Sequence, residues 1–139
     1  MKKITVAVLL FLILALGGCG KSVIYDEPED FKQLEICDYV SPENPDDGYR
    51  GVFYNDRLYL PFGTQGKTIK EEMIKSCIGY TGDDTNARVY TLNDTDDFIA
   101  EYYINGEMMQ FMFLRAADTL GEDIKVPDYI DSLDCDLWK

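Results

Sequence analysis

The chain has 139 residues, with 26 acidic and 13 basic side chains and no histidine, so its formal net charge at pH 7 is −13. So large an acidic excess argues against binding to nucleic acid, whose phosphates would repel it. The lack of histidine excludes Ser-His and Cys-His nucleophile systems and removes a principal zinc ligand. We therefore expect neither a metal nor another cofactor.

The first residues are typical of an export signal. Lys2 and Lys3 precede an uncharged run from residue 4 to residue 16, and the small residues Gly17 and Gly18 follow it. The run is too short to serve well as a permanent membrane span, and its flanks fit a secretory peptide that is cleaved. Residues 1–18 are therefore predicted to be a targeting segment outside the fold.

The sequence Leu16-Gly17-Gly18-Cys19 also resembles the lipobox of bacterial lipoproteins. The resemblance implies cleavage between Gly18 and Cys19 and a diacylglycerol on the Cys19 sulfur. Two acyl chains would hold the protein stably on the extracytoplasmic face of the bacterial cell membrane. In Gram-negative lipoproteins, an aspartate directly after the lipidated cysteine is often associated with retention in the inner membrane. This chain has Gly20 at that position, and a Gram-positive host is therefore expected. The mature domain resembles small Gram-positive lipoproteins only in general layout.

The mature chain is predicted to be more acidic than the precursor. Loss of Lys2 and Lys3 leaves 11 basic residues against 26 acidic ones, a net charge of −15. Residues 19–34 are acidic and interrupted by proline, which predicts a lipidated tether. Residues 35–139 are long enough for one modest domain with a single core.

Two stretches after the tether predict strands. Residues 36–40 form the first predicted strand, and residues 51–60 are predicted to be a hairpin around Asn55-Asp56. Pro61 is expected to limit further pairing, because proline cannot donate to a ladder. The predicted cross-strand pairs are Val52 with Tyr59 and Phe53 with Leu58.

Residues 68–79 predict a helix. Thr68 and Glu71 have the spacing of a capping box, and Gly79 suits the C-terminal end. The sequence leaves open an earlier end, with residues 77–81 extended. The residues that would share the apolar face are Ile69, Met73, Ile74 and Cys77.

Residues 87–92 alternate as a strand does, and residues 97–115 predict the central hairpin of the fold. Asn105-Gly106 is a strong signal for a two-residue turn between two strands. The predicted pairs are Ile104 with Glu107, Tyr102 with Met109, Ala100 with Phe111 and Phe98 with Phe113. The side chains expected in the core are Phe98, Tyr102, Met109, Phe111 and Phe113.

The C-terminal residues predict a second, shorter helix. Pro127 fits its first turn and Leu133 its end, while Leu137 and Trp138 are expected to close the core. The predicted fold class is therefore α+β, with an antiparallel sheet of about five or six strands, one packed helix and a short C-terminal helix.

Three cysteines remain once Cys19 carries lipid, in a compartment where disulfides persist. Cys37, Cys77 and Cys135 cannot all pair within one chain. The sequence leaves two alternatives open: one disulfide with one buried thiol, or three reduced and buried cysteines.

The acidic turn at residues 93–97 partly matches a calcium-binding loop. Asn93, Thr95 and Asp97 place oxygen side chains at alternate positions, but Phe98 and Ile104 stand where such a loop needs glycine and glutamate. A plain acidic turn is therefore favoured. No carboxylate pair stands out among so many acidic residues, and no catalytic residue is assigned.

Aromatic residues supply the remaining candidate site. Tyrosine combines a large apolar area with a polar tip, which suits both half-buried strands and binding surfaces. A structural role is the favoured interpretation. If they share an exposed face, the residues expected to form a binding surface are Tyr54, Tyr59, Tyr103 and Met108.

These observations favour a non-enzymatic cell-surface lipoprotein whose domain binds another protein or peptide. A sharper hypothesis is an inhibitor or immunity-type lipoprotein that captures a basic protein or peptide through acidic loops. A third hypothesis is a carboxylate-based hydrolase of envelope material. The partners implied are the membrane, through lipid on Cys19, and a protein or peptide of basic character.

Overall fold

The computed structural model describes residues 22–107 and 109–139. These residues form eight strands of one antiparallel sheet and three single-turn 3₁₀ helices, and none of them forms a longer helix. The prediction of an α+β domain with a packed helix is therefore wrong. The strands are β1 (Glu35–Val40), β2 (Gly48–Tyr54), β3 (Arg57–Gln65), β4 (Ile74–Tyr80), β5 (Ala87–Leu92), β6 (Phe98–Tyr103), β7 (Met112–Ala116) and β8 (Ile130–Ser132), and the 3₁₀ turns are η1 (Glu71–Met73), η2 (Ala117–Thr119) and η3 (Asp136–Trp138).

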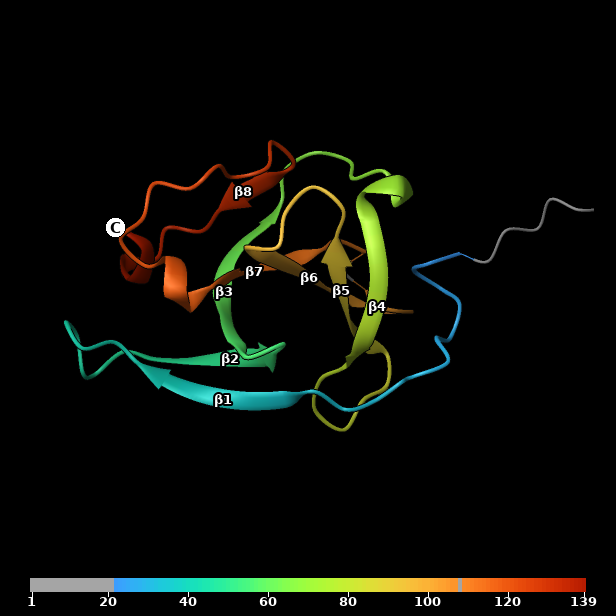
Figure 1. The fold of residues 1–139 in the computed structure, drawn as a ribbon, viewed down its shortest axis with the longest axis horizontal. Helices are drawn as coiled ribbons and strands as arrows, with labels where there is room; N and C mark the ends of the chain where they lie inside the picture. Colours follow the sequence, from blue (N-terminus) through green and yellow to red (C-terminus); the bar gives the residue numbers. More distant parts are fainter. Residues whose placement is uncertain (1–21, 108) are drawn as a thin grey trace, which may run out of the picture.

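The sheet curls so that the segment before β1 meets the end of β4. Its strand order is β1-β2-β3-β7-β6-β5-β4, and β8 adds to β3. In Figure 1, β3 and β4 run on opposite sides and the β1–β2 hairpin crosses below them. The backbone N–H of Leu34 donates to Tyr80 O (2.8 Å) and that of Tyr80 donates to Lys32 O (2.9 Å), so the residues before β1 bond to the end of β4. Gly79 permits this approach, because its φ is +146° and a side chain there would run into the carbonyl of Lys32.

Two apolar clusters pack on the two faces of the sheet. Alternation along β6 explains the division, since Phe98, Ala100 and Tyr102 join one cluster and Ile99 joins the other. Each large side chain that is fully buried contributes roughly 1.5–3 kcal/mol, so these clusters are the main source of stability. The larger cluster contains Phe62, Ile74, Tyr90, Leu92, Phe98, Ala100, Tyr102, Ile104, Phe111, Phe113, Tyr129 and Ile130, and the smaller one Leu34, Val52, Tyr59, Ile78, Val89, Ile99, Leu114 and Ala116.

The predicted first strand and first hairpin are confirmed. Val52 pairs with Tyr59 and Phe53 with Leu58, as the two-residue turn requires. Both turn residues, Asn55 and Asp56, have positive φ (52° and 61°), which is the geometry of a type I′ turn. The expectation for Pro61 is wrong, because β3 continues through a bulge between Pro61 and Gly63 and pairs with both β7 and β8.

The strand at residues 87–92 and the antiparallel pairing of β6 with β7 are also confirmed, but the predicted β6–β7 register is wrong. Ala100 lies opposite Phe113 and Phe98 opposite Arg115, which is a shift of two residues. Phe111 instead accepts a hydrogen bond from the backbone of Gln65 in β3 (3.0 Å). A shift of two keeps every side chain on its predicted face, so Phe111 and Phe113 are buried as expected. Met109 is not, since it is 73% exposed in the longer loop.

The predicted helix over residues 68–79 is wrong. Only η1 is helical there, and β4 follows it at once and pairs with β5. The alternative, a helix with an earlier end, is confirmed only in its extended part from Cys77, which reaches Tyr80 within a strand that already begins at Ile74. Two bulges, at Ile74/Ser76 and Cys77/Gly79, interrupt the ladder.

The predicted C-terminal helix is also wrong, because residues 130–132 form β8. Gly63 permits β8 to pair with the edge of β3, because a side chain at that position would run into the carbonyl of Asp131. Leu133 is therefore exposed rather than packed. Trp138 does reach the larger cluster, as expected, with its ring 5.6 Å from that of Phe62 and its Nε1 donating to Pro61 O (2.8 Å).

The described part of the expected tether, residues 22–34, lies against the sheet. The hydroxyl of Tyr90 donates to Ile24 O (2.6 Å), and Ser22 Oγ donates to Glu71 Oε1 (2.7 Å). Val23 and Ile24 pack against the larger cluster. The length of any free tether stays a prediction.

Candidate functional site

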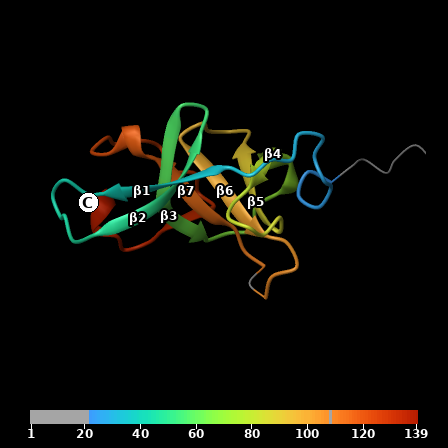
Figure 2. The same cartoon turned by 90° about the horizontal axis from the view of Figure 1, so that it is seen from below.

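The β1–β2 hairpin leaves the sheet as a projecting arm, which we define as residues 35–51. Only residues 52–54 of β2 pair with β3, so the remainder of β2 is paired with β1 alone. Figures 1 and 2 show the connecting loop, residues 41–47, at the outer end of this hairpin, where Ser41, Pro42 and Glu43 line a hollow together with residues 120, 121, 136, 137 and 139. The arm carries five acidic residues and one arginine, Arg50.

A hollow of about 200 Å³ lies between this arm and the sheet. Both the arm and strands β3, β6 and β7 contribute to its wall, which is mainly apolar. Arg50, Thr81 and Glu101 are its charged or hydroxyl-bearing side chains. The complete lining is Ile36, Arg50, Gly51, Val52, Pro61, Thr81, Glu101, Met112, Phe113 and Leu114.

Glu101 is the one carboxylate among these lining residues. It is half-buried in β6, and its Oε1 accepts a hydrogen bond from the hydroxyl of the buried Thr81 (2.6 Å). No lysine or arginine of the described residues forms an ion pair with it. A half-buried carboxylate without a cation is an acceptor available to a positively charged group.

Arg50 is the one cation in the lining, and it is held weakly. Its Nε lies 3.9 Å from Asp38 Oδ1, and the two side chains are 76% and 88% exposed. A pair so exposed contributes little and leaves both side chains free to move.

The outer edge of β1 is unpaired within the described residues. β1 ends the strand order, and its partner β2 lies on one side only. An edge strand presents backbone N–H and C=O groups that another extended segment can use. Val40, which is 55% exposed, adds apolar surface beside this edge.

The acidic turn at residues 93–97 lies beside a larger open hollow of about 620 Å³, but several of its side-chain oxygens already have partners. Thr95 Oγ1 accepts from the backbone N–H of Asp97 (3.1 Å), and Asp94 Oδ1 accepts from the hydroxyl of Tyr129 (2.7 Å). No group of three or more acidic or cysteine side chains among the described residues could hold a metal ion. The calcium interpretation therefore gains no support from these contacts.

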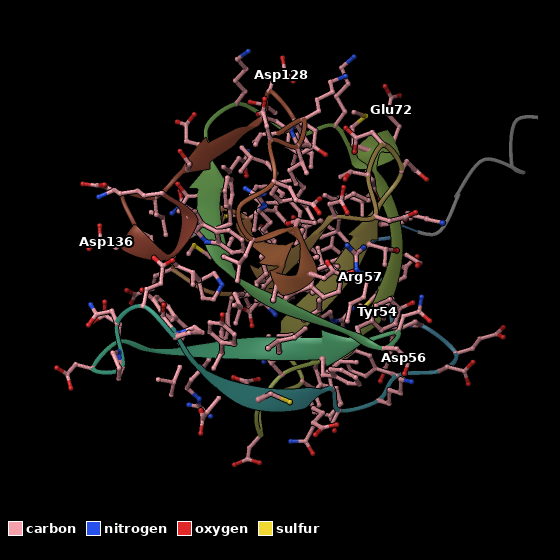
Figure 3. The ribbon with its side chains drawn as sticks, turned by 60° about the vertical axis from the view of Figure 1, so that its left-hand side comes forward. Tyr54, Asp56, Arg57, Glu72, Asp128 and Asp136 are labelled. Atoms are coloured by element: carbon pink, nitrogen blue, oxygen red, sulfur yellow. The ribbon has the colours of Figure 1, made fainter. Side chains whose placement is uncertain are left out.

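Arg57 connects this acidic turn to η2. Its Nη2 lies 2.9 Å from Asp97 Oδ1 and 2.7 Å from Asp118 Oδ1, and its Nη1 donates to Asp96 O (2.9 Å). The guanidinium lowers the pKa of Asp118 below its ordinary value, mainly through these hydrogen bonds. Figure 3 shows Arg57 with Tyr54 and Asp56 at the β2–β3 turn, so this cluster stabilises the fold around the turn.

The proposed aromatic surface is dispersed. Tyr59 is buried, and its hydroxyl donates to Asp96 O (2.9 Å). Tyr54 packs against the smaller cluster, whereas Tyr103 is 45% exposed and donates to Asp84. Met108 lies outside the described residues. The three described tyrosines therefore do not share one exposed face.

All three described cysteines are free thiols. Cys37, Cys77 and Cys135 lie half-buried in β1, in β4 and before η3, respectively. Burial raises the pKa of the Cys77 thiol, which makes it a weaker nucleophile. The second alternative expected buried thiols, whereas all three are only half-buried, so the pairing state of the cysteines stays a prediction.

Cys19 and the expected signal peptide lie outside the described residues, so lipidation stays a prediction. The described part of the chain contains no helix with the length and hydropathy needed to cross a membrane.

Sequence reasoning did not identify Glu101 and Thr81 as site residues. The signal that was present is the single charge within the strand Phe98-Ile99-Ala100-Glu101-Tyr102-Tyr103. The sequence does not show that the arm lies beside Glu101, because the position of the arm over β6 depends on how far the sheet curls.

No family model, curated protein or solved structure matches the chain. The geometry of the arm, the hollow and Glu101 is therefore the basis on which a function is inferred.

Proposed function

We propose that the chain is a lipoprotein, anchored through Cys19 on the extracytoplasmic face of a bacterial cell membrane, whose domain is a non-enzymatic module that binds a basic segment of another protein or peptide. The observation that carries the binding role is the hollow between arm and sheet, with the unpaired carboxylate of Glu101 in its wall. A cation is the group that such a carboxylate accepts best.

The charge of the molecule supports a basic partner. The whole chain has a net charge of −13, and the arm alone carries Glu35, Asp38, Glu43, Asp46 and Asp47 against Arg50. Opposite charge speeds association and suppresses binding of acidic competitors.

The free edge of β1 supports an extended conformation for the bound segment. Strand addition satisfies the backbone of both chains, while pockets beside the edge select side chains. The hollow next to Ile36 of β1 is suitably placed for that selection.

Binding is tested with the mature lipidated protein, purified in detergent. Isothermal titration compares three nine-residue peptides in which threonine alternates with lysine, with serine or with glutamate. We expect the lysine peptide to bind, the glutamate peptide not to bind, and the affinity for lysine to fall as salt is added. Equal affinity for all three peptides, or none for the lysine peptide, would contradict the proposal.

The anchor has a separate test. The wild-type protein should fractionate with membranes and carry the mass of a diacylglycerol on its N-terminal cysteine. Cys19→Ala should abolish both the added mass and the membrane association, whereas Cys37→Ala should change neither. A wild-type protein without added lipid would disprove the anchor and leave the binding proposal to its own test.

A second candidate is an inhibitor or immunity-type lipoprotein, whose arm enters a cleft of a basic protein. The exposed acidic loop at the tip of the arm favours it, with Glu43, Asp46 and Asp47 on residues 41–47. Under this alternative, Glu43→Gln with Asp46→Asn should weaken binding more than Glu101→Gln does. Measuring both variants against the same basic partner distinguishes the tip of the arm from the hollow.

A further inference from the structure

We infer that the hollow is a specificity pocket for one lysine or arginine side chain of the bound segment. The aliphatic stem lies between the arm and β7, and the charged end meets the carboxylate of Glu101. The inference rests on the proposed function, because it names the side chain by which the basic segment is recognised.

The volume of the hollow fits one side chain. At about 200 Å³ it is smaller than the roughly 300–1,000 Å³ that drug-sized ligands occupy. Its lining comes from five strands and Thr81, with β1 and β2 on one side, β6 and β7 on the other, and Pro61 of β3 between them in the sheet. A single long side chain that enters between them would contact both sides.

The chemistry of the lining matches a stem with a cationic end. Ile36, Met112 and Leu114 supply apolar surface, which the methylene groups of lysine and arginine cover well. Thr81 occupies one oxygen of Glu101, and Oε2 accepts no hydrogen bond from the described residues. An ammonium or guanidinium group would give that oxygen a charge-assisted hydrogen bond.

Other side chains are disfavoured by the same lining. An aliphatic side chain would take water away from Glu101 without replacing the lost hydrogen bonds. An acidic side chain would add a like charge beside it. The hollow therefore discriminates by charge at its wall and not only by the overall charge of the molecule.

Arg50 provides an internal test, because it is a cation of the same chain in the same lining. Its weak pair with Asp38 leaves it free to approach the hollow and to repel an incoming cation. Removing its charge with Arg50→Gln should therefore strengthen binding of a basic side chain. Removing the charge of Glu101 should weaken it.

The experiment uses the mature lipidated protein in detergent and two matched heptapeptides, Thr-Val-Thr-X-Thr-Val-Thr, with blocked ends. X is either lysine or norleucine, which keeps the stem and lacks the charge. For the wild-type protein we expect the lysine peptide to bind at least about tenfold more tightly, as one charge-assisted hydrogen bond implies.

Three variants locate the effect. Glu101→Gln keeps an oxygen that can accept from Thr81, so the fold should persist while the preference for lysine is lost. Glu72→Gln removes an equal charge at η1, on the far side of the molecule from the arm in Figure 1, and should keep the preference. Arg50→Gln should increase the preference. Circular dichroism of each variant checks that it is folded.

The outcomes separate the inference from the proposed function. If lysine-rich peptides bind the wild type but Glu101→Gln keeps the wild-type preference, the pocket is disproved and the proposed function stands. If no lysine-rich peptide binds the wild type, the proposed function fails and the inference fails with it. Loss of preference in Glu101→Gln, with retention in Glu72→Gln, supports both.

Discussion

Two glycines of β2 differ in how closely the rest of the chain approaches them. A Cβ atom at Gly51 would lie 2.7 Å from Tyr59 O and 2.8 Å from side-chain atoms of Leu58 and Leu60, whereas one at Gly48 would have nothing within 4 Å. We expect Gly51→Ala to lower the free energy of unfolding by about 1–3 kcal/mol through overpacking. Denaturant titration should show Gly48→Ala within about 0.5 kcal/mol of wild type, since it is a surface substitution. Equal effects would mean that Gly51 does not approach residues 58–60 of β3 as closely as described.

Asp118 makes the free energy of unfolding depend on pH. Hydrogen bonds from Arg57 lower its pKa in the folded state below the ordinary 3.8. Such a carboxylate stabilises the fold above its unfolded pKa and loses that contribution as the pH falls through the lower, folded pKa. The side chain is 58% exposed, so we expect less than about 1 kcal/mol.

The measurement for Asp118 is urea denaturation at steps from about pH 6 down to about pH 2, spanning the usual range of aspartate pKa values. The wild-type free energy of unfolding should fall more steeply than that of Asp118→Asn, and the two curves should converge at the acid end. Parallel curves would show that Arg57 does not hold this carboxylate in solution.

At the scale of elements, the strands were predictable wherever a short turn fixed them. Asn55 and Asp56 are the two residues of the loop, and a two-residue loop fixes the register of β2 with β3. Asn105-Gly106 suggested the same for β6 and β7, but Phe111 bonds to β3 and the loop lengthens. The predicted faces of β6 and β7 are correct because a shift of two residues keeps each side chain on its face. The predicted register is wrong because it depends on a third strand, β3.

The wrong helix at residues 68–79 has a physical cause in the two bulges of β4. A regular strand repeats its faces every second residue, but the bulges set Ile74 and Cys77 against the same cluster, three residues apart. Three-residue spacing is what an amphipathic helix shows. A pattern that arises from bulges therefore cannot be distinguished from a helix by periodicity alone.

Residues 22–34, before β1, were predicted to belong to the tether but lie against the sheet. Tyr90→Phe would remove the hydrogen bond from its hydroxyl to Ile24 O while keeping the ring in the larger cluster. We expect a loss of about 1 kcal/mol in the free energy of unfolding, and weaker amide protection over residues 22–34. Hydrogen exchange followed by mass spectrometry measures the second effect. Unchanged protection there would show that this hydrogen bond does not hold the segment on the sheet.

At the scale of the molecule, the described segment that follows the expected anchor lies on the opposite side from the loop of the arm. Ser22, bonded to Glu71, is three residues from Cys19, a span of at most about 11 Å for extended chain. In Figure 1 the N-terminal segment and the loop of the arm leave the sheet on opposite sides. A lipid on Cys19 would thus hold the domain close to the membrane with the arm directed away from it, where a partner can reach it.

Salt should act on folding and on binding in opposite directions, because the same excess of acidic side chains underlies both. Raising the ionic strength from about 0.01 M to about 0.15 M shortens the Debye length from about 30 Å to about 8 Å. Screening relieves repulsion among the acidic side chains, so we expect the melting temperature to rise. The same screening should weaken the affinity for the lysine peptide. Calorimetry and isothermal titration on one protein sample measure the two effects side by side. An affinity that rose together with the melting temperature would mean that salt acts by stabilising the folded protein, and the electrostatic basis of recognition would then be wrong.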